Sequence, residues 1–184
     1  MPFIFLLILI VVVIGVVIAM YNGLVRLRMQ VKNAWAQIEV QLKRRHDLIP
    51  NLVETVKGYA AHEKDTLQNV TEARTAAQSA QGVSQQAQAE GKLSRSLMNL
   101  FAVAERYPDL KANQNFLALQ EELSSTENKI AFARQFFNDA VMQFNTKIQT
   151  VPANIIAGMF GFKEEDMFEI QDAAEREVPK VSFN

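Results

Sequence analysis

The chain has no cysteine and only two histidines, His46 and His62, in 184 residues. It therefore has no disulfide, no thiolate metal ligand and no cysteine nucleophile. A catalytic zinc ion usually takes three protein ligands, and neither histidine has a second and a third ligand at helical spacing. His62 and Glu63 begin like a zinc-protease motif, but the second histidine of that motif is missing. We expect no metal site and no cofactor.

The chain also lacks an excess of charge of either sign, with 19 Lys and Arg against 20 Asp and Glu and a formal net charge of −1. Proteins that hold nucleic acid by neutralising phosphates need a basic field, so we expect no nucleic-acid partner. No G-x-S-x-G nucleophile elbow occurs. Gly91-Lys92-Leu93-Ser94 resembles the end of a phosphate-binding loop, but Gln86 replaces the first glycine of that loop. These absences predict a protein that is not an enzyme.

One long apolar run dominates the start of the chain, where every residue from Phe3 to Met20 is apolar. As a helix this run is about 27 Å long, close to the hydrocarbon core of a bilayer at about 30 Å. Tyr21 follows it at the position of an interfacial aromatic anchor. A cleaved signal peptide has a basic start, a shorter apolar core and a small-residue cleavage site, and none of these is convincing here. The run predicts a transmembrane helix.

The placement of basic residues predicts the topology. Arg26, Arg28 and Lys32 follow the apolar run, whereas the amino terminus is the only positive charge before it. Lys and Arg that flank a membrane helix are enriched on the cytoplasmic side. We expect a single-pass protein with its N-terminus outside and its soluble domain in the cytoplasm.

Apolar periodicity predicts helices in the rest of the chain. In the first predicted helix, which runs from Leu24 to Lys57, a kink or a restart is expected at Pro50, because proline cannot donate a backbone hydrogen bond. In the last predicted helix, which runs from Asn113 to Gln149, apolar residues recur every seven residues from Phe116 to Phe144. The predicted helices are Leu24–Lys57, Ala61–Ala80, a third helix after an N-cap at Ser84, and Asn113–Gln149.

These patterns predict an all-α fold, with an N-terminal transmembrane helix followed by an elongated antiparallel four-helix bundle. The expected division is a membrane anchor at 1–23, a bundle domain at 24–150, and an apolar patch with an irregular or extended tail at 151–184. The patch is expected to pack within the chain, to lie in the membrane interface or to join neighbouring subunits, and we rank packing within the chain first. Its residues are Ile155, Ile156, Met159, Phe160 and Phe162.

A charged residue interrupts the apolar seam of the first bundle helix. Near-heptad spacing places Arg45 on that seam, where a buried guanidinium needs an acidic partner, and Glu127 and Asp47 are the candidates. We expect a polar network that fixes the register of the bundle. The alternatives are a ligand or catalytic site at the same place, or simple exposure of Arg44 and His46. The other members of the candidate network are Arg44, Arg134 and Asn138.

Three blocks of sequence carry a family resemblance. AWAQIEVQLKRRHDLIPNLVETVKGYAAHE at Ala34–Glu63 resembles the signature of the LemA family. RYPDLKANQNFLALQEELSSTENKIAFARQFFNDAVMQFNTKIQTVP at Arg106–Pro152 is similar to the C-terminal helix of that family, and IIAGMFGF at Ile155–Phe162 to its closing segment. The resemblance implies a bacterial inner-membrane protein with an N-terminal anchor, a helical bundle and no known catalytic activity. It also implies a candidate partner, a membrane-bound zinc metalloprotease of the heat-shock type.

The leading functional hypothesis is a membrane-anchored, non-enzymatic scaffold or adaptor. Its expected partners are membrane lipid, other copies of the chain in a homo-oligomer, and a membrane protein such as the metalloprotease. The alternative hypothesis is a ligand-binding receptor or an enzyme that uses the polar cluster around Arg45 and Glu127.

Overall fold

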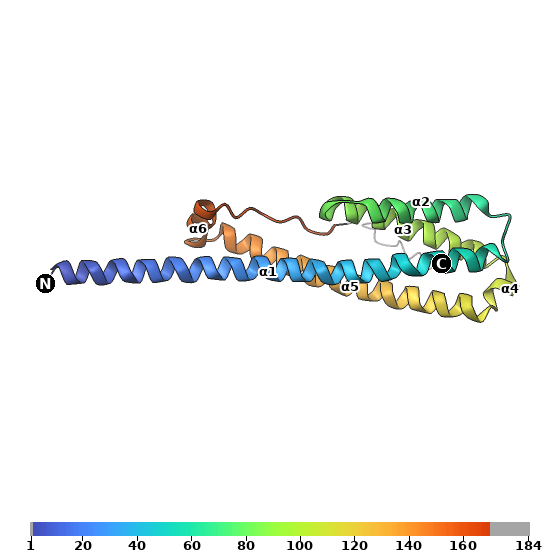
Figure 1. Ribbon diagram of the computed structural model, residues 1–184, viewed down its shortest axis with the longest axis horizontal. Coiled ribbons are helices and arrows are strands. Elements are labelled where there is room, and N and C mark those ends of the chain that lie inside the picture. Colours follow the sequence, from blue (N-terminus) through green and yellow to red (C-terminus); the bar gives the residue numbers. More distant parts are fainter. Residues whose placement is uncertain (1, 170–184) are drawn as a thin grey trace, which may run out of the picture. The chain divides into compact units, whose positions relative to one another are not determined.

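The computed structural model describes residues 2–169, and every regular element in this range is an α-helix (Figure 1). The all-α prediction is therefore confirmed. Residues 162–169 have no regular structure, and the rest of the expected tail lies outside the described residues. The helices are α1 (Pro2–Lys57), α2 (Lys64–Ser79), α3 (Gly82–Ala104), α4 (Pro108–Lys111), α5 (Gln114–Gln149) and α6 (Ala153–Phe160).

Helix α1 joins the apolar run to the first bundle helix without a break, over 56 residues. The run has the length and composition of a membrane span, and none of its 18-residue window is buried within the described chain. Its large apolar side chains, such as Phe3, Leu9 and Ile18, are more than half exposed. The N-terminal part of α1 is therefore a candidate transmembrane helix.

We expected a kink or a restart at Pro50, and the restart does not occur, since α1 continues through this residue. An interior proline costs a helix about 3 kcal/mol because it removes one N–H group and crowds the carbonyl four residues earlier. Ile49 and Leu52, on either side of it, are completely or almost completely buried. Burial of each such side chain contributes about 1.5–3 kcal/mol, which is enough to hold the helix together across the proline.

Two helix boundaries show where local signals succeeded and failed. Helix α1 ends at Lys57, the residue at which the sequence predicted its end. The predicted N-cap at Ser84 is wrong, because α3 begins at Gly82 and its N-cap is Gln81. Gly82 has φ 77°, a left-handed conformation that glycine adopts at little cost. The chain thus turns at this glycine, and Ser84 becomes part of the helix.

The described chain divides into two compact units. Unit 1 contains residues 2–40 and 130–167, and unit 2 contains residues 41–129 with 168 and 169. The long helices α1 and α5 contribute to both units. The division into domains at residues 23 and 150 stays a prediction.

Unit 2 is a bundle built from the last turns of α1, from α2 and α3, and from the first half of α5, with α4 between α3 and α5 (Figure 1). Helix α1 is antiparallel to α5, because Arg45 contacts Glu127 while Tyr59, just after α1, contacts Asn113, just before α5. The shared apolar core is formed by Ile49, Leu52, Val56, Ala60, Leu67, Val70, Ala77, Leu93, Leu97, Leu100, Ala104, Leu110, Phe116 and Leu123.

Unit 1 combines the first part of α1 with the second half of α5 and with α6. Trp35 of α1 packs on Phe137 of α5 with ring centroids 5.4 Å apart. Leu24 and Ile38 are fully buried, as is Phe144 on α5. The near-heptad spacing read from the sequence is therefore the spacing of the buried face.

Candidate functional site

Arg45 is the largest fully buried charged side chain among the described residues, with 2% of the residue exposed. It lies in unit 2 on the buried face of α1, one heptad before Leu52. Its guanidinium forms ion pairs with Glu90 of α3 and Glu127 of α5. The charged group thus connects three helices of the bundle. The sequence offered Glu127 and Asp47 as candidate partners, of which Glu127 is one, but did not identify Glu90.

Glu90 is the centre of this polar cluster, with 5% of its side chain exposed. Its Oε1 atom lies 2.9 Å from His46 Nε2 and accepts a hydrogen bond of 2.8 Å from Gln86 Nε2. Its other carboxylate oxygen, Oε2, pairs with Arg45. Both oxygens are therefore occupied, as a carboxylate in a bundle core requires.

The environment of Glu90 keeps its carboxylate ionised. Burial by itself raises its pKa, but the hydrogen bond to His46 and the charges of Arg45 and His46 outweigh burial, so the pKa lies below its usual value of 4.5. An ionised carboxylate only accepts hydrogen bonds. His46 Nε2 must therefore carry the hydrogen of the shared bond. The expectation that His46 is simply exposed is wrong, since only 6% of it is exposed.

Arg45 makes further contacts that fill most of its donor capacity. Its Nη1 atom donates to Ser94 Oγ at 3.2 Å, and Nη2 donates to the backbone carbonyl of Glu90 at 3.4 Å. Its Nε atom is buried without a hydrogen-bond partner among the described residues. Most of the guanidinium is thus satisfied by the protein itself, and loss of a partner from such a buried pair is strongly destabilising.

A second feature of the cluster explains how α1 tolerates Pro50. The carbonyl of His46 is the group that would accept the N–H of residue 50, and proline has none. Arg74 Nε on α2 donates to this carbonyl at 2.7 Å. A side chain from a neighbouring helix thus replaces the lost backbone hydrogen bond, which sequence reasoning missed because the two residues lie on different helices.

The other members of the predicted network are placed differently. Arg44 forms an ion pair with Glu122, and both side chains are more than a third exposed, so this pair is worth about 0–1 kcal/mol. Asp47 is exposed and takes part in none of the ion pairs found within residues 2–169. It is therefore not the partner of Arg45. Arg134 and Asn138 are half-buried and belong to unit 1, and their part in a network stays a prediction.

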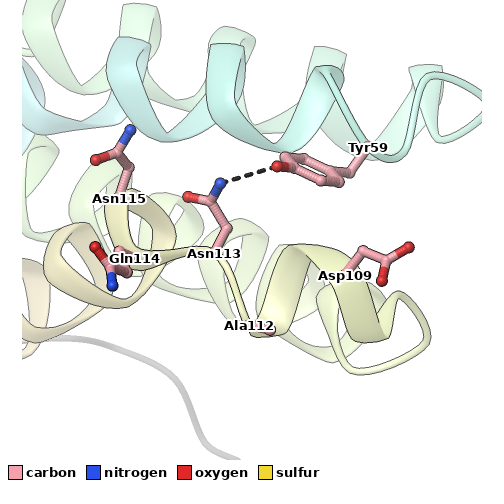
Figure 2. Close-up of a pocket in the computed structure, with 6 residues that line it drawn as sticks. All are labelled: Tyr59, Asp109, Ala112, Asn113, Gln114 and Asn115. Carbon is pink, nitrogen blue, oxygen red and sulfur yellow. Dashed lines mark hydrogen bonds between the residues drawn. The ribbon is translucent and has the colours of Figure 1, made fainter.

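An open polar depression of about 510 Å³ lies at the end of unit 2 where α4 leads into α5 (Figure 2). Asn113 and Tyr59 both line it, and Asn113 Nδ2 donates to the hydroxyl of Tyr59 at 2.9 Å. Asn113 Oδ1 accepts the backbone N–H of Phe116 at 3.1 Å, which is an N-cap for α5. The amide is thus engaged in structural hydrogen bonds at both ends. The remaining lining residues are Asp109, Ala112, Gln114 and Asn115.

The apolar patch near the end of the described chain forms α6 and the two residues after it. Ile156 is buried, whereas Ile155, Met159 and Phe160 are more than half exposed. Phe162 is half-buried and contacts Tyr21 and Phe144 edge-on. One side of the patch is thus packed within unit 1. The other side is not covered by the described chain.

The polar residues of the cluster around Arg45 are engaged with one another. Within residues 2–169, no three side chains of His, Asp or Glu are grouped so that they could hold a metal ion. Arg45 and Glu90 are joined to each other and nearly sealed from solvent. The chemistry of this cluster is that of a buried ion-pair network that connects helices.

The LemA family matches residues 34–183. The chain belongs to the LemA family. This confirms the resemblance read from the three sequence blocks. The match begins after the apolar run and includes the whole of unit 2, so Arg45, Glu90 and Glu127 lie within the LemA region.

Two kinds of LemA relative are similar over most of the chain. Protein LemA of Metamycoplasma hominis is 26% identical over 167 residues, which cover 89% of this chain and 73% of the relative. Magnetosome protein MamQ 2 of Paramagnetospirillum magneticum is 24% identical over 184 residues, which cover 86% of this chain and 68% of the relative. Magnetosome protein MamQ of Magnetospirillum gryphiswaldense is 23% identical with the same coverage. Together with the apolar helix, these findings support a membrane-associated helical protein.

Proposed function

We propose that this LemA-family chain is a membrane-anchored, non-enzymatic scaffold or adaptor of the bacterial inner membrane. The observation that carries the proposal is the continuity of α1, a single helix from Pro2 to Lys57. The candidate membrane span and residues of the bundle core, such as Ile49 and Leu52, belong to the same helix. A protein that binds the bundle is thereby held at the bilayer.

The surface of unit 1 supports binding to another protein. Phe132 and Phe136 lie one helical turn apart on α5 and are 74% and 53% exposed. Aromatic side chains are enriched at protein interfaces compared with other surfaces. In the plane of a membrane, confinement raises the effective concentration of such surfaces. The proposed partners are another copy of the chain or a membrane protein, with the metalloprotease implied by the family as the first candidate.

The proposed topology has the N-terminus outside and the bundle in the cytoplasm. Its support is the cluster of Arg26, Arg28 and Lys32 directly after the apolar run. All three side chains are exposed in unit 1, as basic residues next to a membrane surface should be.

The test is purification of the full-length protein from its native membrane in a mild detergent, with mass spectrometry and light scattering of the eluted complex. We expect a stoichiometric membrane protein or a homo-oligomer. Phe132→Ser combined with Phe136→Ser should weaken the complex, whereas Met98→Ser, at a methionine that is 68% exposed in unit 2, should leave it intact. A monomer without partners would contradict the scaffold function.

The alternative function is a ligand-binding receptor or an enzyme built on Arg45 and Glu127. The side chain of Glu127 is 50% exposed and pairs with Arg45, so a small cation or polar ligand has access to one side of the pair. A small-molecule screen by thermal shift on the wild type and on Glu127→Gln tests this alternative. A ligand that stabilises only the wild type would favour it over the scaffold.

A further inference from the structure

The uncovered side of α6 is a compact apolar surface that the scaffold function does not use. Ala153, Ile156 and Ala157 face the interior of unit 1 and are at most 6% exposed. Ile155 and Met159, one turn apart, are 59% and 72% exposed. An eight-residue helix with one buried and one exposed apolar side is unusual in water, where exposed apolar side chains normally lie singly.

The position of α6 along α1 indicates what covers this surface. The ring of Phe160 lies 4.7 Å from the ring of Tyr21. Tyr21 directly follows Met20, the last residue of the apolar run. If that run spans about 30 Å of hydrocarbon, Tyr21 lies at the membrane–water interface. The contact with Tyr21 places α6 at the same level.

Several contacts connect α6 and the segment after it to the rest of unit 1. Phe162, two residues after the helix, packs beside Tyr21, and the guanidinium of Arg28 lies 5.3 Å above its ring. Asn145 on α5 then holds the following segment, with hydrogen bonds of 2.9 and 3.0 Å to the backbone of Glu165. The helix is therefore tied to both α1 and α5.

We propose that α6 is a second membrane contact, whose exposed residues Ile155, Met159 and Phe160 insert into the interfacial region of the bilayer that α1 spans. The proposal rests on the proposed membrane anchor, because the bilayer is located by the apolar run of α1. Helix α6 is too short to cross the membrane itself. Apolar side chains of interfacial helices typically reach about 5–10 Å into the boundary between headgroups and acyl chains. Two points of contact would limit tilting of α1 in the bilayer.

The chain offers a clean test, because it contains no cysteine that would compete for a label. The full-length protein is reconstituted in phosphatidylcholine vesicles with a minority of phosphatidylglycerol. Single cysteines are introduced by Met159→Cys and Ile155→Cys and carry an environment-sensitive fluorophore. Met142→Cys, at a methionine that is 51% exposed on α5, is the matched control, and Ile18→Cys reports on the anchor. Lipids with nitroxides at shallow and deep positions quench the fluorophores.

We expect the labels at Met159 and Ile155 to shift to shorter emission wavelengths and to be quenched most by shallow nitroxides. The label at Ile18 should be quenched most by deep nitroxides, and the label at Met142 should not be quenched. If the labels on α6 behave like Met142 while Ile18 is quenched, the proposal for α6 is wrong and the anchor stands. If the label at Ile18 is not quenched, the proposed membrane anchor is wrong, and so is the proposal for α6 that rests on it.

A blue shift at Met159 without quenching by either nitroxide would mean that protein, such as a second copy of the chain, covers this surface. That outcome would also overturn the lipid contact. Dilution of the reconstituted protein into excess vesicles distinguishes coverage by a second copy from insertion into lipid. Dilution reduces contacts between copies but leaves lipid contacts unchanged.

Discussion

The carboxylate of Glu90 joins three side chains from two helices, namely Arg45 and His46 of α1 and Gln86 of α3. Pairs of this kind carry a desolvation cost, so their presence alone adds little to stability. Removal of one member is different, because it leaves a buried charge without its partner. Single substitutions in this buried network should therefore have large effects on the free energy of unfolding.

We predict that Glu90→Gln lowers the free energy of unfolding by roughly 3–5 kcal/mol, because Arg45 then keeps only Glu127 as a charged partner. Denaturant unfolding followed by circular dichroism measures the effect. Glu122→Gln, which removes the exposed partner of Arg44, is the matched control and should cost at most about 1 kcal/mol. Equal effects of the two substitutions would show that the buried network does not stabilise the bundle.

The lowered pKa of Glu90 predicts a specific dependence of stability on pH. Above its usual pKa of 4.5, Glu90 is ionised in the folded and in the unfolded chain, and its full contribution is present. As the pH falls below this value, the unfolded chain binds the proton first, so stability decreases until the pH is below the folded pKa. Measured between about pH 6 and pH 3, the loss of stability should be less steep in Glu90→Gln. If stability decreased equally with falling pH in the wild type and in Glu90→Gln, the lowered pKa of Glu90 would be contradicted.

At the scale of the helix, α1 shows how a proline inside a helix is accommodated by a neighbouring helix. Pro50 leaves the carbonyl of His46 without its helical donor, and Arg74 of α2 donates to it at 2.7 Å. The helix is thus completed by a residue 28 positions away in the sequence. This makes the stability of α1 depend on the docking of α2.

A double-mutant cycle tests this dependence. Arg74→Met keeps most of the apolar stem but removes the donor, and should cost about 1–3 kcal/mol in the wild type because a carbonyl loses its hydrogen bond. In the background of Pro50→Ala, the new N–H group can donate to His46 and the cost of Arg74→Met should be smaller. We expect a coupling of about 0.5–3 kcal/mol from chemical denaturation. Additive effects would mean that Arg74 does not replace the missing donor.

At the scale of the whole molecule, one property to be tested is topology. The basic residues Arg26, Arg28 and Lys32 should keep the bundle in the cytoplasm. In spheroplasts, a tag at the C-terminus should resist external protease until the membrane is permeabilised. Replacing the three basic residues by glutamine and placing lysines before Phe3 should expose the tag in a fraction of molecules. Cleavage of the wild-type tag in intact spheroplasts would reverse the proposed orientation.

Local patterns in the sequence were sufficient for the four longer helices, α1, α2, α3 and α5, but did not predict the short helices α4 and α6. The candidate membrane span needs only a continuous apolar run, and the buried faces of α1 and α5 need only apolar residues every three to four positions. The contact of Arg45 with Glu127 was also predictable, because both residues interrupt apolar seams of long helices. Glu90 carried the same signal, since it stands one turn before Leu93 and two turns before Leu97 on the apolar side of α3.

The sequence by itself thus determined the four longer helices, the candidate span and the position of Arg45 on an apolar face, because each depends on neighbours within a few turns. Only the tertiary structure decided that Glu90 joins Arg45, that Arg74 completes the helix around Pro50, and that one side of α6 is buried while the other remains uncovered. These outcomes depend on which faces of distant helices meet. Burial and hydrogen bonding between such faces arise from packing, which no local pattern specifies.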